Sequence, residues 1–454
     1  MGSVSVQLQW RWNQPPPPSP SLAVTVTMNV VNMQRCRCAL TKQGERFLTK
    51  LAANSDSGTH TFIRRFVNGS PKSVALSTLS HLLSPSSSFS RLSSLALPLY
   101  SCIAQAPWFS WNPAIVADLA ALLDQLGRSE EAEALIFEAT SKLESRNREL
   151  ALFYCKLLES HAKRGSQKGF DAAYSYLNQL LRSSSSVYIK RRAFEFMVSG
   201  LCAMDKPREA EDLVEDLRGN GGGIEPSAFE LKSIMYAYGR LGLFNDMQRV
   251  VDQRQSGGFE IDTVCANMVL STYGTHGEYM EMVSWLKKMR SSGIPFSVRT
   301  YNSVSNSCPT IMRMMEELNE LPLSIEELNV RLEGGEAMVL RELMESCVIL
   351  EEVMVWDSLE AKLDLHGCHL GSSYLIMLLW LKEMQRRLND SNYGIPTEIT
   401  VVCGSGKHSN VRGESPVKVL VKKMMVNMGS PLRIDRKNNG CLIAKGRAVK
   451  NWLC

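Results

Sequence analysis

The first 44 residues contain neither Asp nor Glu, and Glu45 is the first acidic residue of the chain. The charged side chains of this stretch are all basic: Arg11, Arg35, Arg37 and Lys42. A secretory signal is disfavoured because the stretch has no long apolar core and is interrupted by the prolines at 15–18. Residues 1–44 therefore predict an organelle transit peptide. The proline-broken, weakly amphipathic pattern favours the chloroplast over the mitochondrion, and a disordered tail is the alternative.

The twelve cysteines are scattered, and no Cys-x-x-Cys pair occurs. This disfavours zinc-finger and thioredoxin-type sites, so we predict no metal site from cysteine spacing. Disulfide frameworks are typical of small secreted domains, whereas this chain has 454 residues, so a reducing compartment is expected. Long apolar runs are also missing, since Tyr374–Leu381 is far shorter than the roughly 20 residues of a membrane helix. We expect no membrane partner.

The net charge of +5 is unevenly distributed. Residues 310–362 contain four basic and thirteen acidic side chains, whereas residues 404–454 contain eleven basic and two acidic ones. Basic segments attract polyanions such as nucleic acids. We interpret residues 311–360 as an acidic helical connector and the C-terminal end as a surface for a polyanion. Ordinary solvated helix faces are the alternative.

A serine-rich stretch lies between the N-terminal leader and the middle of the chain, with serines at 84, 86, 87, 88 and 90. Such low-complexity composition is typical of spacers. We interpret residues 45–111 as a linker, within which Val74–Leu83 has the composition of one short helix.

A period of 35 residues runs through the middle of the chain. The turn Tyr238–Gly242 recurs 35 positions later as Tyr273–Gly277, and Asn267 and Asn302 are separated by the same distance. Each unit has the pattern of two amphipathic helices that end at Gly or Pro. Stacking about five such pairs buries one continuous core and predicts an α-helical solenoid over residues 112–310.

The units resemble the pentatricopeptide repeat family, most clearly where Thr300-Tyr301-Asn302 follows Gly293-Ile294-Pro295. The resemblance implies binding of single-stranded RNA at one base per repeat, read by the fifth and last residues of each repeat. Carried over to this sequence, these nucleic-acid-binding positions are Asn267 with Ser297, Lys232 with Asp262, Glu195 with Ser227, and Asn302 of an incomplete repeat. A solenoid that binds protein is the alternative.

The last hundred residues alternate between strand and helix patterns. Strands are predicted at 362–365, 398–403, 432–435 and 441–444, and helices at 371–388 and 416–427. This order predicts a small α/β sandwich over residues 361–454. Glycine-containing turns follow the first two strands, and ligands bind beyond the carboxyl ends of such strands. We therefore expect the two turns to converge on one site.

Leu363-Asp364-Leu365-His366-Gly367 and Gly404-x-Gly406-Lys407-His408-Ser409 resemble the two motifs of the small MutS-related (SMR) domain. The resemblance implies nucleic-acid binding and, in several members, endonucleolytic nicking of RNA or DNA. Phosphodiester cleavage needs proton transfer and cations near the developing negative charge. The candidate catalytic residues are Asp364, His366, Lys407 and His408. The candidate phosphate contacts are the amides of Gly404 and Gly406 and the side chains of Lys418, Lys422 and Lys423.

A repeat array followed by an SMR domain resembles plant organelle proteins that act on RNA, in agreement with the acid-free leader. The leading hypothesis is an organellar single-stranded RNA-binding protein that acts in RNA processing or expression within a ribonucleoprotein. Ser405 stands where many SMR domains carry a basic residue, which favours binding and leaves cleavage open. No cofactor is expected for binding, and Mg²⁺ is expected only with cleavage. The alternatives are a protein-interaction scaffold and a nucleoid-associated protein that binds or nicks DNA.

Overall fold

The computed structural model describes residues 40–53, 58–85, 89–219, 224–258, 260–345, 348–404 and 415–454. The chain divides into two compact units, residues 1–225 and 226–454. Across the described segments, no helix is long and apolar enough to cross a membrane. The predicted transit peptide lies outside the described residues up to position 39.

The first unit begins with helices in the stretch that we interpreted as a linker. They are α2 (Lys42–Ala53), α3 (Thr59–Gly69), α4 (Lys72–Leu82), the 3-10 helix η1 (Ser90–Leu95) and α5 (Ala96–Ala104). Leu79 and Leu99 are buried among them, and the rings of Phe47 and Phe66 stack with their centroids 3.7 Å apart. Residues 45–111 thus contain packed helices instead of a simple linker, because apolar side chains at helical spacing outweigh the serine content.

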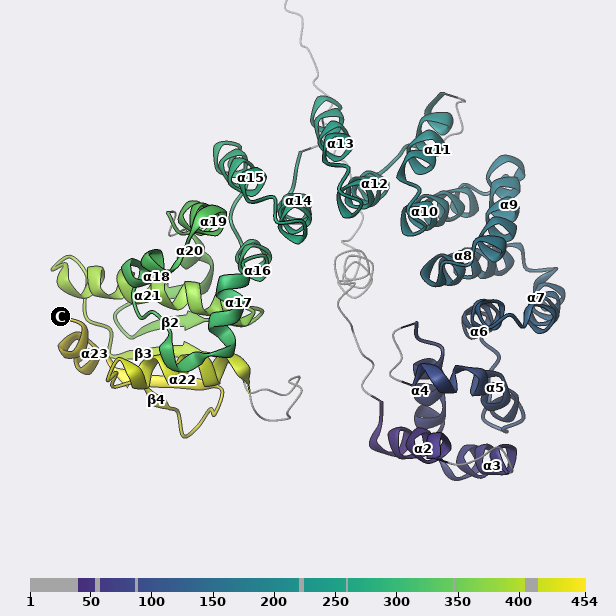
Figure 1. Cartoon of the computed structure of the whole chain (residues 1–454), viewed down its shortest axis with the longest axis horizontal. Coiled ribbons are helices and arrows are strands. Elements are labelled where there is room, and N and C mark those ends of the chain that lie inside the picture. The colour runs from purple at the N-terminus through teal and green to yellow at the C-terminus, as the bar shows by residue number, and fades with distance from the viewer. Residues whose placement is uncertain are drawn as a thin grey trace, which may run out of the picture. The chain divides into compact units, whose positions relative to one another are not determined.

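Three helix pairs follow in the first unit (Figure 1). They are α6 (Pro113–Gln125) with α7 (Ser129–Leu143), α8 (Asn147–Arg164) with α9 (Gln167–Ser183), and α10 (Val187–Ala203) with α11 (Pro207–Gly219). Asn112 caps α6 through its side chain, and Pro113 occupies the first turn. Gly127 and Gly165 follow α6 and α8 with φ of +75° and +66°, the left-handed backbone that ends a helix.

The repeats of the second unit form two layers. The helices are α12 (Ala228–Arg240), α13 (Phe244–Ser256), α14 (Thr263–Thr275), α15 (Tyr279–Ser291), α16 (Val298–Asn306) and α17 (Pro309–Glu316). Helices α12, α14 and α16 are successive neighbours in one layer, while α13 and α15 lie in the other (Figure 1). Ser227, Asp262 and Ser297 cap the three helices of the first layer. The helix pairs expected from the 35-residue period are present.

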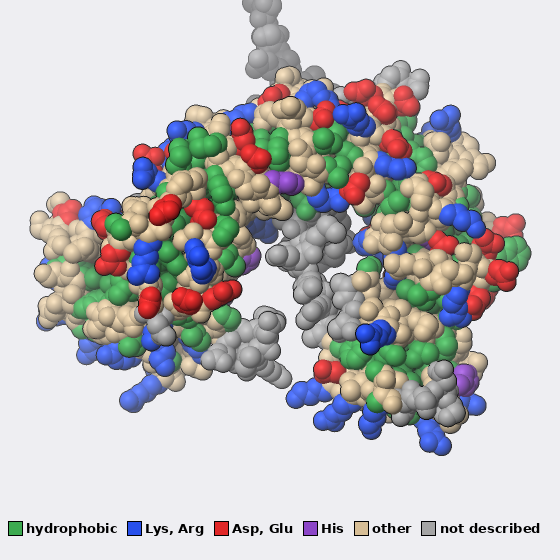
Figure 2. Space-filling model, in the orientation of Figure 1, with side chains coloured by type: hydrophobic (Ala, Val, Ile, Leu, Met, Phe, Trp, Pro, Cys, Tyr) green, Lys and Arg blue, Asp and Glu red, His purple; other side chains and the backbone are tan. Residues whose placement is uncertain are grey.

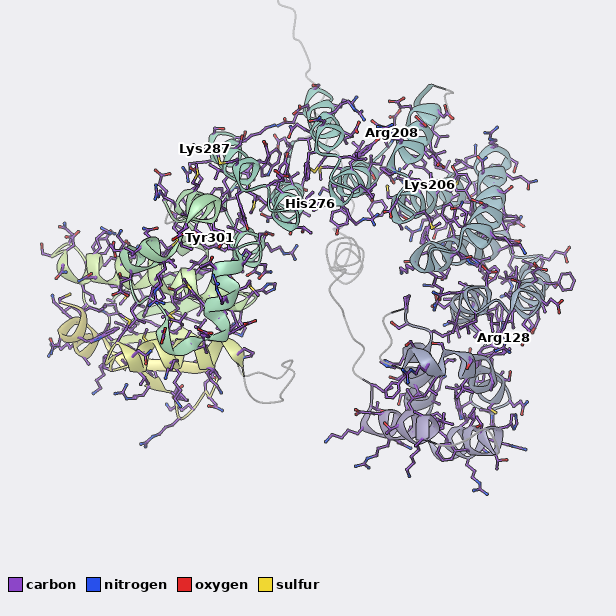
Figure 3. All side chains as sticks on the ribbon, viewed as in Figure 1. Arg128, Lys206, Arg208, His276, Lys287 and Tyr301 are labelled. Atoms are coloured by element: carbon purple, nitrogen blue, oxygen red, sulfur yellow. The ribbon has the colours of Figure 1, made fainter. Side chains whose placement is uncertain are left out.

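The acidic connector is helical, as predicted. It contains the 3-10 helix η2 (Leu318–Glu320) and helices α18 (Ile325–Arg331), α19 (Gly334–Met344) and α20 (Ile349–Val353). Arg290 of α15 lies 2.8 Å from Glu342 and 2.9 Å from Glu345. Tyr301 points from α16 towards α19 (Figure 3), where its hydroxyl donates to the Leu343 carbonyl at 3.1 Å. These contacts pack the connector firmly onto the last repeats.

A five-stranded sheet ends the chain, in the order β1-β2-β3-β5-β4. Its elements are β1 (Met354–Trp356), β2 (Glu360–Asp364), α21 (Leu370–Asn389), β3 (Glu398–Val402), α22 (Pro416–Asn427), β4 (Arg433–Ile434), β5 (Cys441–Lys445) and α23 (Gly446–Leu453). Strands β2 and β3 are parallel with Asp364 opposite Val402, and the remaining pairs are antiparallel. The predicted order is confirmed, except that the sequence did not reveal the three-residue edge strand β1.

Glu383 of α21 predicts an acid-sensitive contribution to stability. Hydrogen bonds from Arg386 and then Arg387 lower the pKa of its carboxyl from 4.5 to about 2. Since the folded-state pKa is the lower one, this stabilisation is complete above pH 4.5 and is lost as the pH falls towards 2. We expect Glu383→Gln to weaken the pH dependence of the urea midpoint in this window. Glu326→Gln is the matched control, since the Glu326 side chain is 74% exposed. An unchanged pH profile in Glu383→Gln would contradict the prediction.

Candidate nucleic-acid interface

Two of the expected base-reading pairs come together between successive repeats. Lys232 Nζ lies 2.6 Å from the Asp262 carboxylate. Asn267 Nδ2 donates to Ser297 Oγ at 3.4 Å. Each pair joins the first helix of one repeat to the N-cap of the next, so its two side chains share one place on the layer of α12, α14 and α16.

Asn267 has a hydrogen-bond acceptor that no described residue satisfies. The residue is 7% exposed, and its Oδ1 is buried without a hydrogen-bond partner. A buried acceptor left unpaired costs about 1–3 kcal/mol. Rotation about the Cβ–Cγ bond is loosely restricted and would turn the amide towards a ligand. Asp262 differs, because its carboxylate binds Lys232 and also accepts from the Cys265 amide at 2.8 Å.

The third expected pair, Glu195 and Ser227, is divided between the two units. The Glu195 carboxylate lies 2.8 Å from Arg191 and 2.7 Å from Arg192. Ser227 caps α12 in a capping box with Glu230. Both side chains therefore have partners within their own units, and their pairing on a base stays a prediction.

The expectation that Asn302 reads a base does not agree with the structure. Its Nδ2 donates to the Gly367 carbonyl at 2.9 Å. Its Oδ1 accepts from the His369 amide at 2.9 Å and from the Ser372 hydroxyl. Asn302 is only 9% exposed, and both ends of its amide are hydrogen-bonded to the turn that follows β2. These partners lie 65 to 70 residues further along the chain, so no local pattern could have revealed them.

The turn after β2 and Gly404, the first glycine of the turn after β3, lie side by side, as expected. Leu365 N donates to Val402 O at 2.9 Å and so extends the parallel pair. A Cβ atom added to Gly404 would lie 3.7 Å from His366 Nε2. We call Asp364, His366 and Gly404 the rim.

The rim contains a paired acid and imidazole. The Asp364 Oδ1 atom accepts from the His366 backbone amide at 2.9 Å and lies 2.7 Å from His366 Nδ1. The side chain of His366 is 64% exposed and that of Asp364 is 44% exposed. The carboxylate thus both caps the turn and orients the ring, and both groups are accessible to a ligand.

The second motif continues beyond the described residues. Gly406, Lys407 and His408 lie within residues 405–414, outside the described residues, so their roles stay predictions. In the described segments, no group of three His, Cys, Asp or Glu residues is arranged to hold a metal ion. Protein-bound Mg²⁺ commonly uses one or two carboxylates together with substrate phosphates. A magnesium ion at the rim would therefore depend on Asp364 and on phosphate oxygens of the bound nucleic acid.

The predicted lysine track on α22 is only partly exposed. Lys422 is exposed and Lys423 is half-buried, whereas Lys418 is 9% exposed. Lys418 shares the buried face of α22 with Val421 and Met425, three and seven positions further on. The prediction that Lys418 belongs to an exposed lysine track is therefore wrong.

Other bases gather on the C-terminal domain. Figure 2 shows basic side chains along the border near β4 and acidic ones over the connector helices. The exposed bases of this end include Arg433, Arg436, Lys437, Lys445 and Arg447. The charge asymmetry of the sequence therefore appears as two differently charged surfaces within the second unit.

The cysteines beside the rim are unsuited to nucleophilic chemistry. Burial raises the pKa of Cys368 and of Cys403 to about 12, so both thiols are protonated at neutral pH. Burial also lowers the pKa of His369, whose Nδ1 lies 2.8 Å from Asn306 Nδ2. His369 is thus a neutral acceptor within the packed turn, and His366 presents the accessible imidazole.

Comparison with known proteins places the chain in a family. No family model matches it. A pentatricopeptide repeat-containing protein of Arabidopsis thaliana is 52% identical over 429 residues, which cover 94% of this chain and 84% of that protein. The chain belongs to the pentatricopeptide repeat family. More distant pentatricopeptide repeat-containing relatives, both named as chloroplastic, come from A. thaliana (24% identical, 44% of this chain and 38% of the relative) and Zea mays (20%, 51% and 35%).

Crystal structures of the maize pentatricopeptide repeat protein PPR10 are also similar to this pentatricopeptide repeat chain. The free protein matches with a TM-score of 0.34 and 13% identity, over 90% of this chain and 64% of PPR10. Its complex with an 18-nt psaJ RNA element matches with a TM-score of 0.25 and 12% identity, over 70% and 53%. The matched part is less than two thirds of PPR10, and the family assignment rests on the A. thaliana sequence.

Proposed function

We propose that this pentatricopeptide repeat protein binds single-stranded RNA through the layer of α12, α14 and α16 and acts in organellar RNA processing or expression. The observation that carries the proposal is the pairing of Asn267 with Ser297, since its unpaired buried acceptor lies at an expected base-reading position. A base N–H group would satisfy that acceptor, and this family reads one base per repeat. The acid-free leader and the chloroplastic relatives support a chloroplast location, with the mitochondrion as the alternative.

The C-terminal domain is proposed to be an SMR-like domain that grips the same nucleic acid. Support comes from the position of Gly404, the first residue of the second motif, beside His366 of the first, and from the exposed bases of the domain. Contacts between basic side chains and phosphates are independent of base sequence and weaken with salt. This domain would therefore add affinity, while the repeats would add selectivity.

Binding by the full chain to a randomised single-stranded RNA pool tests the proposal. We expect a sequence motif to be enriched among the bound molecules, and we expect single-stranded DNA of the same length to compete poorly. Equal competition by DNA would favour the nucleoid-associated alternative. No retention of RNA even at low salt would favour a protein-interaction scaffold and would refute the proposal.

RNA cleavage at the rim is the second candidate function, favoured by the exposed Asp364–His366 pair. In this reading His366 would carry the proton, and Asp364 would orient its ring and help to hold Mg²⁺ together with phosphate oxygens of the RNA. We expect Asp364→Ala to slow Mg²⁺-dependent cleavage of end-labelled organelle RNA about tenfold, the lower end for loss of a carboxylate that orients a histidine. Glu360→Ala, in the same strand, is the matched control. Identical product patterns and rates with Asp364→Ala would remove Asp364 from catalysis.

A further inference from the structure

Asn302 occupies a base-reading position in the repeat series but is used for another purpose. Lys232, Asn267 and Asn302 follow one another at intervals of 35 residues. The partners of the first two lie 30 residues further on, at Asp262 and Ser297. The corresponding partner of Asn302 would be Leu332, an apolar residue that is 5% exposed and has no side-chain hydrogen-bonding group.

The amide of Asn302 instead forms a clasp on the turn after β2. Its nitrogen donates to Gly367 O at 2.9 Å, and its oxygen accepts from His369 N at 2.9 Å and from the Ser372 hydroxyl. One turn further along α16, Asn306 Nδ2 lies 2.8 Å from His369 Nδ1. An asparagine side chain offers two donor hydrogens and one acceptor oxygen, and here both ends are engaged on the same turn.

The clasped turn carries the rim. Gly367 and His369, which Asn302 binds, lie one and three positions after His366, and the His366 ring lies beside Gly404. Helix α16 also packs against α21, which begins immediately after the turn. Asn302 therefore attaches the rim to the place in the repeat series where the next base of a bound RNA strand would otherwise be read.

We infer that Asn302 is a positioning residue that ends the base-reading row and holds the rim one repeat beyond the Asn267–Ser297 pair. The nucleotide adjacent to the one read by that pair would then meet the Asp364–His366 rim in a fixed register. This inference rests on the proposed RNA binding, but it makes a separate claim about spacing. The inference also predicts that no base of any identity is read at the Asn302 position, because both ends of the Asn302 amide are already hydrogen-bonded to the turn.

Photocrosslinking of the full chain to the randomised single-stranded RNA pool tests this spacing. A photoreactive residue would be placed in one sample at Ser271, which is exposed on α14 one helical turn beyond Asn267, and in another at His366. The crosslinked nucleotide would be mapped against the enriched motif. We expect one dominant nucleotide from each position, the two being immediate neighbours in the RNA. A crosslink from position 271 together with scattered or remote crosslinks from position 366 would overturn the inference and leave RNA binding intact. Failure of both positions to crosslink any RNA would refute the proposed function and the inference together.

Asn302→Asp tests the clasp itself. The carboxylate still accepts from His369 and Ser372 but cannot donate to Gly367 O, so the turn loses one of its fixed contacts. We expect crosslinks from position 366 to spread over several nucleotides, while the crosslink from position 271 stays in place and shows that the repeats remain folded. Asn389→Asp, at an exposed site on α21, makes the same chemical change and is expected to keep the single neighbouring crosslink. An unchanged dominant crosslink in Asn302→Asp would contradict the clasp.

Discussion

Gly446→Ala is expected to destabilise the C-terminal sheet by about 3 kcal/mol, the upper part of the usual range for overpacking. A Cβ atom at this position would lie 1.8 Å from the Pro396 carbonyl oxygen. That oxygen is part of the backbone that leads into β3, and Gly446 N also donates to Thr397 O at 3.1 Å. The clash cannot be relieved by rotating a side chain, so the ends of β3 and β5 must separate.

Hydrogen exchange of the β3 and β5 amides, measured by mass spectrometry, checks this prediction. A loss of about 3 kcal/mol corresponds to roughly 100-fold faster exchange through opening of the sheet. Gly394→Ala is the matched control, because a Cβ atom there would meet nothing within 4 Å. Equal exchange rates in the two variants would show that the approach of Gly446 to Pro396 is not needed for the fold.

Replacing both Asn267 and Ser297 by alanine is expected to lower the affinity for the selected RNA about 100-fold. The estimate assumes that one bidentate contact to a base edge is lost, which contributes about 1–3 kcal/mol in total. Selectivity at the corresponding nucleotide should fall as well, because the repeat would present only methyl groups to the base edge. Binding titrations against the enriched RNA and against versions changed at single positions measure both effects.

The matched control for the double variant of Asn267 and Ser297 is Lys287→Ala. Lys287 is exposed on α15, in the other layer of the repeats, and is labelled in Figure 3. Its loss removes a positive charge without altering the α12–α14–α16 layer, so affinity is expected to change little. Equal losses in the control and in the double variant would show that binding depends on overall charge and would contradict base reading by Asn267 and Ser297.

The rim is the part of the candidate site that could be predicted from the sequence. Asp364 and Gly404 follow parallel strands, and the carboxyl ends of neighbouring parallel strands meet at one edge of a sheet. Their convergence was therefore predictable from the strand order alone. The 2.7 Å contact of Asp364 with His366 lies within one turn of chain and was equally accessible to local reasoning.

Lys418 shows where the same reasoning fails. Helical spacing shows which residues share a face of α22, but it does not show whether that face is exposed to solvent or packed against the domain. The Lys418 side chain lies on the same face of α22 as Val421 and Met425, which are buried in the domain. A lysine can occupy such a place because its long apolar stem contributes to packing while the ammonium group reaches outward.

The sequence by itself determined the repeat period, the alternation of strands and helices near the C-terminus and the positions of Asp364, His366 and Gly404 at the ends of two strands. These features depend on residue periodicity, helix caps and glycine turns, which act over a few positions. Only the tertiary structure decided that the stretch before the repeats is packed and that the connector is attached to α15. It also decided that the amide of Asn302 binds the turn after β2 instead of facing a ligand. Those outcomes depend on contacts between residues up to 70 positions apart, which the local pattern of a single chain does not encode.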